Sequence, residues 1–208
     1  MKPIIWLLGL LVLVVVGTGA FIWSGAYNIA ADDPHWPLTE FAMETARERS
    51  IAAHASGIAV PVLDDESMIR GGAGNYDAMC AGCHLQPGVE QTELSDGLFP
   101  APPNLGRRRS ADPAAAFWVI KHGIKMSGMP AWGKNMDDES IWGMVAFLRQ
   151  LPEISPERYR ELVAASGGHS HGTNEDESHG HDDAPADVHE EDMKTHVHED
   201  SSQHEHKN

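Results

Sequence analysis

The sequence predicts an all-α chain, because every segment with a regular hydrophobic pattern has the spacing or the end signals of a helix. Residues 4–23 form an apolar run without a charge, long enough to cross a bilayer as a helix. Residues 112–123 and 137–149 each begin at an aspartate suited to capping and carry apolar side chains at helical spacing. From residue 168 onward the chain is rich in His, Asp, Glu, Ser and Gly, so residues 168–208 predict a disordered tail.

Residues 1–25 predict a transmembrane anchor. Lys2 precedes the apolar run, whereas Asp32 and Asp33 follow it, so the positive-inside bias places the N-terminus in the cytoplasm and the rest of the chain outside. A cleaved signal peptide is the alternative, because Ser24-Gly25-Ala26 offers small residues to a peptidase. The apolar run exceeds the usual 7–15 residues of a signal sequence, which favours the anchor.

Residues 26–63 predict a linker with a helical spacer. Pro34-His35-Trp36-Pro37 is a stiff exit from the membrane, and a helix is expected from Thr39, as its N-cap, to about Ala55. Its charges are mixed and its apolar content is small, so a solvated spacer is favoured over a second membrane or partner role.

Residues 64–152 predict the main folded domain. Asp65 is suited to cap a helix in which Gly72, Tyr76 and Cys80 recur at four-residue intervals on one face. A glycine inside a helix lowers stability, so Gly72 makes sense where another helix backbone crosses closely.

The crossing partner is expected in residues 137–149, where Asp137 or Asp138 is the cap. Its apolar positions follow the helical pattern and are Ile141, Met144, Val145, Phe147 and Leu148. Asp112, Pro113 and Gly123 supply the start and stop of a third helix. Residues 153–167 predict a short C-terminal helix that begins at Ser155 and Pro156.

The chemistry-bearing motif is Cys80-Ala81-Gly82-Cys83-His84. Cys-x-x-Cys-His is the attachment signature of c-type haem, in which Cys80 and Cys83 form thioethers and His84 is the proximal iron ligand. A thioredoxin-like dithiol needs no histidine here and has a βαβ setting, which this sequence lacks. A zinc half-site has no second cysteine pair to complete it. The motif therefore predicts one covalent haem c.

A second axial ligand is expected downstream, at Met129. Pro130 disfavours helix at Met129, and Gly128 lets the backbone approach a flat ring, so the thioether can project from a loop. Met126, His122 and Met136 are the less favoured candidates.

Five motifs in this order resemble class I cytochrome c, and the run from Phe117 to Ile124 through Gly128-Met129-Pro130-Ala131-Trp132 is similar to membrane-anchored monohaem bacterial members. The five motifs are Gly72 with Tyr76, the Cys80–His84 motif, Pro103-Asn104-Leu105, Met129 in its loop, and the helix with Phe147. The resemblance implies the class I cytochrome c fold around one haem, in which the first and last helices cross. It also implies that the Pro103 carbonyl accepts the Nδ1 proton of His84.

Charge is unevenly distributed along a chain of net charge −16. Residues 105–136 are basic, with Asp112 as the one acid against Arg107, Arg108, Arg109, Lys121, Lys125 and Lys134. This balance argues against nucleic acid as a partner, and it fits either a docking collar for an acidic redox protein or an ordinary solvated surface.

Four His-x-His pairs lie in the tail: His169/His171, His179/His181, His196/His198 and His204/His206. Imidazoles among carboxylates suit Cu(II), Zn or Ni, and the alternative is an acidic tail without a metal role. The tail is also a candidate to fold back on the basic window and compete with a partner.

The leading interpretation is an electron carrier and not an enzyme, anchored by one span in the bacterial inner membrane with its haem domain in the periplasm. Its expected partners are redox proteins, including a membrane oxidoreductase complex. A haem-based redox or metal sensor that uses the tail is the alternative, and a haem enzyme, which needs an absent or labile Met129, comes third.

Overall fold

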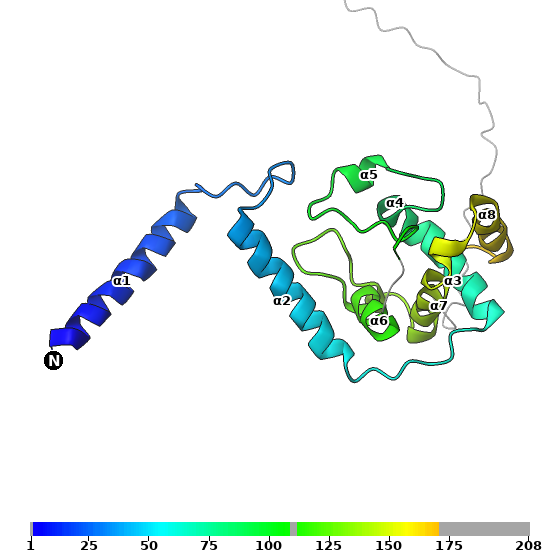
Figure 1. Ribbon diagram of the computed structural model, residues 1–208, viewed down its shortest axis with the longest axis horizontal. Helices are drawn as coiled ribbons and strands as arrows, with labels where there is room; N and C mark the ends of the chain where they lie inside the picture. The colour runs from blue at the N-terminus through cyan, green and yellow to red at the C-terminus, as the bar shows by residue number, and fades with distance from the viewer. Residues whose placement is uncertain (1, 109–111, 171–208) are drawn as a thin grey trace, which may run out of the picture. The chain divides into compact units, whose positions relative to one another are not determined.

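The structure is a computed structural model that describes residues 2–108 and 112–170, and every element it describes is helical (Figure 1). The all-α prediction is therefore confirmed. The elements are α1 (Lys2–Trp23), α2 (Pro37–Ala55), α3 (Glu66–Met79), α4 (Ala81–His84), α5 (Glu93–Asp96), α6 (Pro113–His122), η1 (Trp132–Lys134), α7 (Asp138–Leu148), η2 (Leu151–Glu153) and α8 (Pro156–Ala165).

Helix α1 has the length and composition of a membrane-spanning helix. Within Pro3–Trp23, an 18-residue window has a mean hydropathy of 2.6, and none of it is buried against the rest of the protein. A signal sequence shares these properties. An apolar helix of this length leaves no polar backbone group unpaired in a bilayer, which is why such a run is stable there.

Helix α2 begins three residues earlier than expected, with Trp36 as its N-cap and Pro37 as its first residue, so the prediction of Thr39 as the N-cap is wrong. Pro37 occupies the first helical position, where its fixed φ suits a helix and its missing N–H costs nothing. The other end of α2 packs on α6, because Ala55 is buried and the His54 ring lies 5.4 Å from the Trp118 ring.

The central packing is the crossing of α3 and α7, where two glycines let the backbones meet. A Cβ added at Gly72 would lie 2.0 Å from the carbonyl oxygen of Gly143. One turn further on, the rings of Tyr76 and Phe147 are 5.5 Å apart, and both side chains are fully buried. The close crossing expected at Gly72 is confirmed by these contacts.

Helix α8 covers the same core from the C-terminal side. Tyr159 is buried with its ring 6.0 Å from that of Phe147, and its hydroxyl donates a 2.8 Å hydrogen bond to Asp77 of α3. After α8, Ser170 N–H donates to the buried side chain of Asn75, so the end of the described chain lies on α3.

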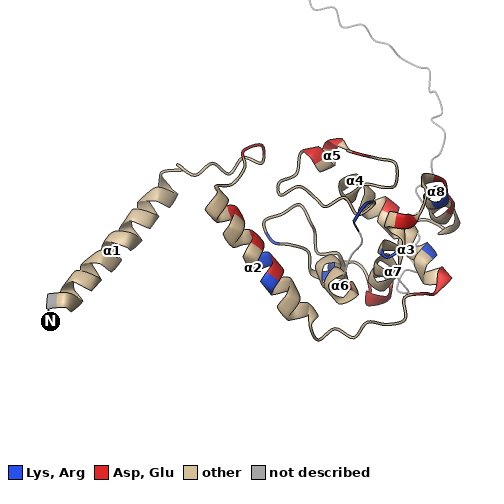
Figure 2. Cartoon of the chain, viewed as in Figure 1, with Lys and Arg blue, Asp and Glu red and all other residues tan. Residues whose placement is uncertain are grey.

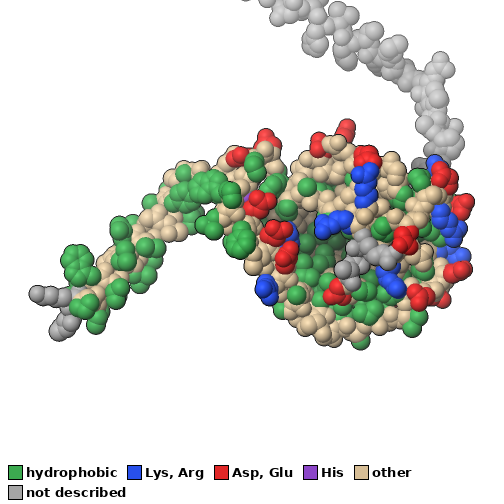
Figure 3. All heavy atoms as spheres, viewed as in Figure 1, with side chains coloured by type: hydrophobic (Ala, Val, Ile, Leu, Met, Phe, Trp, Pro, Cys, Tyr) green, Lys and Arg blue, Asp and Glu red, His purple; other side chains and the backbone are tan. Residues whose placement is uncertain are grey.

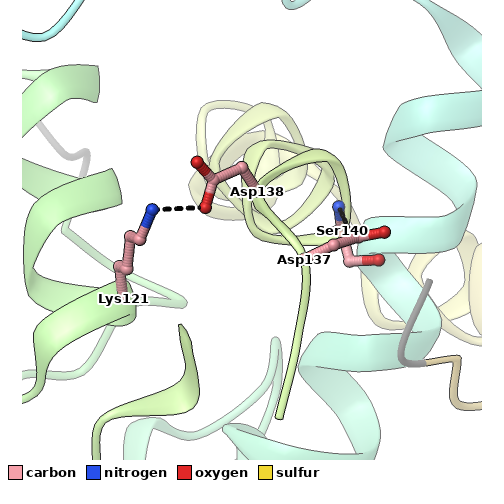
Figure 4. A network of polar contacts seen from close by, with 4 residues as sticks. All are labelled: Lys121, Asp137, Asp138 and Ser140. Atoms are coloured by element: carbon pink, nitrogen blue, oxygen red, sulfur yellow. Dashed lines mark hydrogen bonds and ion pairs between the residues drawn. The ribbon is translucent and has the colours of Figure 1, made fainter. Parts of the chain in front are cut away.

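The helix starts follow the predicted caps. Asp65 accepts from Met68 N–H, Asp112 from Ala114 N–H, Asp137 from Ser140 N–H, and Ser155 from Arg158 N–H. Figure 4 shows the start of α7, where Asp137 makes the cap while Asp138 pairs with Lys121 at 2.6 Å. The structure thus selects Asp137 from the two candidates.

Candidate haem site

The Cys80–His84 motif lies at a break between α3 and α4. Cys80 is the C-cap of α3, and its carbonyl then accepts hydrogen bonds from the N–H groups of Cys83 and His84 at 3.1 and 2.8 Å. One short turn therefore carries both cysteines and the histidine. The two thiols are free and form no disulfide.

The environment of Cys80 favours an uncharged sulfur. The residue is buried, and this burial, with a smaller contribution from Cys83, raises the pKa of the Cys80 thiol to about 12. A redox dithiol needs a thiolate, which burial disfavours at Cys80. A thioether carries no charge, so this pocket suits it.

The imidazole of His84 is fixed by the chain. Its Nδ1 lies 2.9 Å from the carbonyl oxygen of Pro103. Because a carbonyl only accepts, Nδ1 carries the proton and Nε2 keeps its lone pair. Burial lowers the pKa of His84, while the bond to Pro103 opposes this effect, so the neutral form that binds metals is favoured.

The residues around His84 are also tied down. Leu105 N–H donates to the carbonyl of His84 at 3.0 Å, which aligns the Pro103 segment with the motif. The Tyr76 hydroxyl donates to the carbonyl of Leu85 at 2.5 Å. The core crossing of α3 and α7 thereby also positions the turn that follows His84.

Met129 lies in a tight loop after α6. Its N–H donates to the Ser127 hydroxyl, and its carbonyl accepts from Ile124 N–H at 3.1 Å. A Cβ at Gly123 would lie 2.7 Å from that carbonyl, so the loop returns directly onto the end of α6. The side chain of Met129 is half-buried against the core.

The other candidates for the second ligand have different surroundings. Met136 is a buried member of the core, whereas Met126 is 88% exposed and has a positive φ. His122 is exposed, and its ring lies 5.2 Å from that of Trp118 on the same helix. None of these observations tests ligation, so the assignment of Met129 stays a prediction.

The surroundings of the motif fit a large flat cofactor. Figure 3 shows a hollow with mainly hydrophobic walls between α4 and α6. The side-chain oxygen of Asn104, next to Pro103, is buried and has no hydrogen-bond partner among the described residues. Two thiols on one turn, a neutral imidazole and an apolar hollow together suit a haem.

Two residues near the motif were not singled out by the sequence patterns. The Thr92 hydroxyl caps α5 and donates to the carbonyl of Gly82, so α5 lies against the motif. Leu98 packs on Gly128, where a Cβ would lie 2.7 Å from its side chain. The Thr92/Ser95 capping box was the one local signal for the start of α5. A helix of four residues is too short to show a hydrophobic pattern, so the sequence did not predict it.

The basic window is less uniform in space than in sequence. Figure 2 shows acidic residues as well as basic ones on the elements around α3 and α7. Arg107 forms an ion pair with Glu90, and Lys121 pairs with Asp138, both acids from outside the window. Arg109 lies outside the described residues. Pairing lowers the local positive potential, so a basic docking collar has less support than the sequence alone gives it.

The predicted tail sites are described only at their beginning. His169 is exposed, while His171, His179, His181, His196, His198, His204 and His206 lie outside the described residues. In residues 2–108 and 112–170, no group of three or more His, Cys, Asp or Glu side chains is placed to hold a metal ion. Metal binding by the tail stays a prediction.

Comparison with known protein families gave a match to part of the chain. Residues 67–148 match the sequence model of the family described as cytochrome c oxidase, cbb3-type, subunit III. Searches of curated proteins and of solved structures found no match to the chain. The matched segment runs from the start of α3 to the end of α7 and includes the Cys80–His84 motif and the Met129 loop. Residues 67–148 are therefore a c-type cytochrome domain, consistent with class I cytochrome c.

Proposed function

We propose that this protein is a membrane-anchored periplasmic electron carrier with one haem c, attached through Cys80 and Cys83 and ligated by His84 and Met129. The cytochrome domain itself implies haem-based electron transfer. The observation that carries the proposed ligation of the iron by His84 is the hydrogen bond from His84 Nδ1 to the Pro103 carbonyl, which leaves the lone pair of Nε2 to bind the metal.

Each residue has a distinct task in this proposal. When bound, the haem iron accepts and releases one electron between its Fe(III) and Fe(II) forms. Cys80 and Cys83 retain the group through both states by covalent bonds. The Pro103 carbonyl fixes the ring of His84 and increases its basicity. The thioether of Met129 raises the reduction potential, because sulfur is a poor donor to Fe(III).

The setting proposed for this activity is the outer side of the bacterial inner membrane. The apolar helix α1 supports anchoring, and the positive-inside bias supports a periplasmic haem domain. The matched family is described as an oxidase subunit, which supports a redox partner in a membrane oxidoreductase complex. If His84 and Met129 both hold the iron, the domain would offer no open site for oxygen chemistry and would pass electrons to such a partner.

Absorbance of the protein expressed with a working haem-attachment system tests the proposal. We expect a sulfur-to-Fe(III) absorption band and resistance to CO. Met129→Leu should abolish the band and allow CO to bind, whereas the matched control Met126→Leu should change neither, because Met126 is 88% exposed. A colourless protein would refute haem attachment, and an unchanged Met129→Leu spectrum would refute the second ligand.

A further inference from the structure

Helix α2 presents an apolar face that no described part of the protein covers. Leu38 is 80% exposed and Phe41 is 67% exposed. With Thr45, they stand three and seven residues apart and so share one side of the helix. The segment that leads into α2 adds Ile29, at 88%, and Trp36, at 56% (Figure 3).

A different side of α2 packs on the cytochrome domain, about 100° around the helix from Leu38 and Phe41. Arg47 and Ile51 are half-buried and Ala55 is buried, at intervals of four residues. The contact between His54 and Trp118 lies near Ala55, at the C-terminal end of α2. Leu38 and Phe41 are therefore outside the contact with α6, and packing of the domain does not explain their side chains.

The beginning of α2 is joined to the end of α1 by aromatic contacts. The ring of Trp36 lies 6.0 Å from that of Phe21, in the last turn of α1, and 5.1 Å from that of Tyr27. Trp and Tyr are enriched where a membrane meets water. If α1 crosses the bilayer, Trp36 lies at the depth where that helix leaves it, and Leu38 and Phe41 follow within two turns of helix.

We infer that the first half of α2 lies in the headgroup region of the same bilayer that α1 crosses, with Leu38 and Phe41 facing the acyl chains. This inference rests on the proposed membrane anchoring. A lipid surface fits better than a protein partner, because the face continues from the membrane helix, Glu40 lies away from it, and Glu44, three residues after Phe41, stands at its edge where a headgroup region meets water. Through the packing of α2 on α6, this contact holds the cytochrome domain close to the membrane surface.

Site-directed spin labelling of the full-length holoprotein in phosphatidylcholine–phosphatidylglycerol vesicles tests the inference. The chain has two cysteines, and thioether formation consumes both, so an introduced cysteine is the single free thiol. Labels are placed by Phe41→Cys and by the matched control Met43→Cys, an exposed position two residues further along that faces the opposite side of the helix. Collision with oxygen, which partitions into lipid, is compared with collision with a water-soluble nickel chelate.

We expect the ratio of oxygen to chelate collisions to be severalfold higher at position 41 than at position 43. Equal ratios, or shielding of position 41 from both reagents as in a protein–protein contact, would overturn the inference. A label introduced by Val12→Cys, in the middle of α1, separates the proposed membrane anchoring by α1 from the inferred position of α2 at the membrane surface. If position 12 collides with oxygen and position 41 with the chelate, only the interfacial face is refuted; if position 12 itself collides with the chelate, the anchoring is refuted as well.

Discussion

The crossing of α3 and α7 predicts a large difference between two neighbouring glycines. In Gly72→Ala, the new Cβ would lie 2.0 Å from the Gly143 carbonyl oxygen, whereas ordinary contact begins near 3.4 Å. Because the obstacle is backbone, no side-chain rotation relieves it and the helices must separate. In Gly71→Ala, the new Cβ meets nothing within 4 Å.

The expected loss of unfolding free energy in Gly72→Ala depends on the side chains packed between α3 and α7. Separation loosens the packing of Tyr76, Ile141, Met144 and Phe147, all fully buried. Overpacking of this kind costs about 1–3 kcal/mol and more where the backbone must move, and alanine returns about 1 kcal/mol of helix propensity. We expect Gly72→Ala to lower the free energy of unfolding by about 3 kcal/mol and Gly71→Ala to raise it by up to about 1 kcal/mol.

Urea unfolding of the full-length holoprotein in detergent, followed by haem absorbance, measures both effects. With a slope of about 2 kcal/mol per molar urea, the midpoint of Gly72→Ala should fall by about 1.5 M. The control should keep or slightly raise the midpoint. If the two variants shift the midpoint equally and in the same direction, the close backbone approach is not what places glycine at position 72.

Three further predictions concern the axial ligand and the helix starts. Met129→Leu should lower the reduction potential in a redox titration, because it removes a ligand that favours Fe(II), while Met126→Leu should leave the potential unchanged. At the start of α7, Asp137→Ala should lower the unfolding free energy by about 1 kcal/mol, because it removes the side chain that accepts from Ser140 N–H. Asp138→Asn removes an exposed ion pair with Lys121 and should lower the unfolding free energy by less than about 1 kcal/mol. Equal losses would contradict the distinct roles of the two aspartates in Figure 4. Hydrogen bonds from Ser67 and Met68 lower the pKa of Asp65 below its usual 3.8, so the folded state favours the carboxylate, and the resulting stability is present above about pH 4 and lost as the pH falls through the lowered pKa. The Asp65→Asn variant should therefore have a lower unfolding free energy than the unmodified protein at about pH 5, and this difference should shrink as the pH is lowered towards about 2. A difference that stays constant over this pH range would contradict this origin of the stability.

Much of the fold was predictable because its helices carry local signals. Asp112, Pro113 and Gly123 mark α6 by the chemistry of its first and last turns, and the structure has that helix at Pro113–His122. Gly72 indicated a long-range feature, since a glycine that weakens a helix locally needs a compensating contact, here supplied by Gly143. The start of α2 was misplaced because the proline at the first helical position outweighs a later threonine.

The part of the site that depends on tertiary contacts was less accessible. The cysteines and histidine were identifiable from spacing alone, and the resemblance implied the contact of His84 with Pro103. The burial of Cys80 and the placement of α5 through Thr92 arise from residues brought together by folding, and no local pattern encodes them. The pairing of Arg107 with Glu90 is a further example: residues 105–136 are basic in sequence, but folding places an acidic residue from outside this segment beside one of its arginines.

The meeting of Gly72 with Gly143 also bears on the order of events in the proposed export of the domain. The two positions are separated by most of the cytochrome domain, so α3 cannot bury its glycine face until α7 is present. In the proposed topology, the segments after α1 would reach the far side of the membrane before the later ones, so the Cys80–His84 turn would be exposed while this closure is still impossible. The late helix would thus leave an interval in which both thiols are reachable for haem attachment, and would lock the turn in place only afterwards.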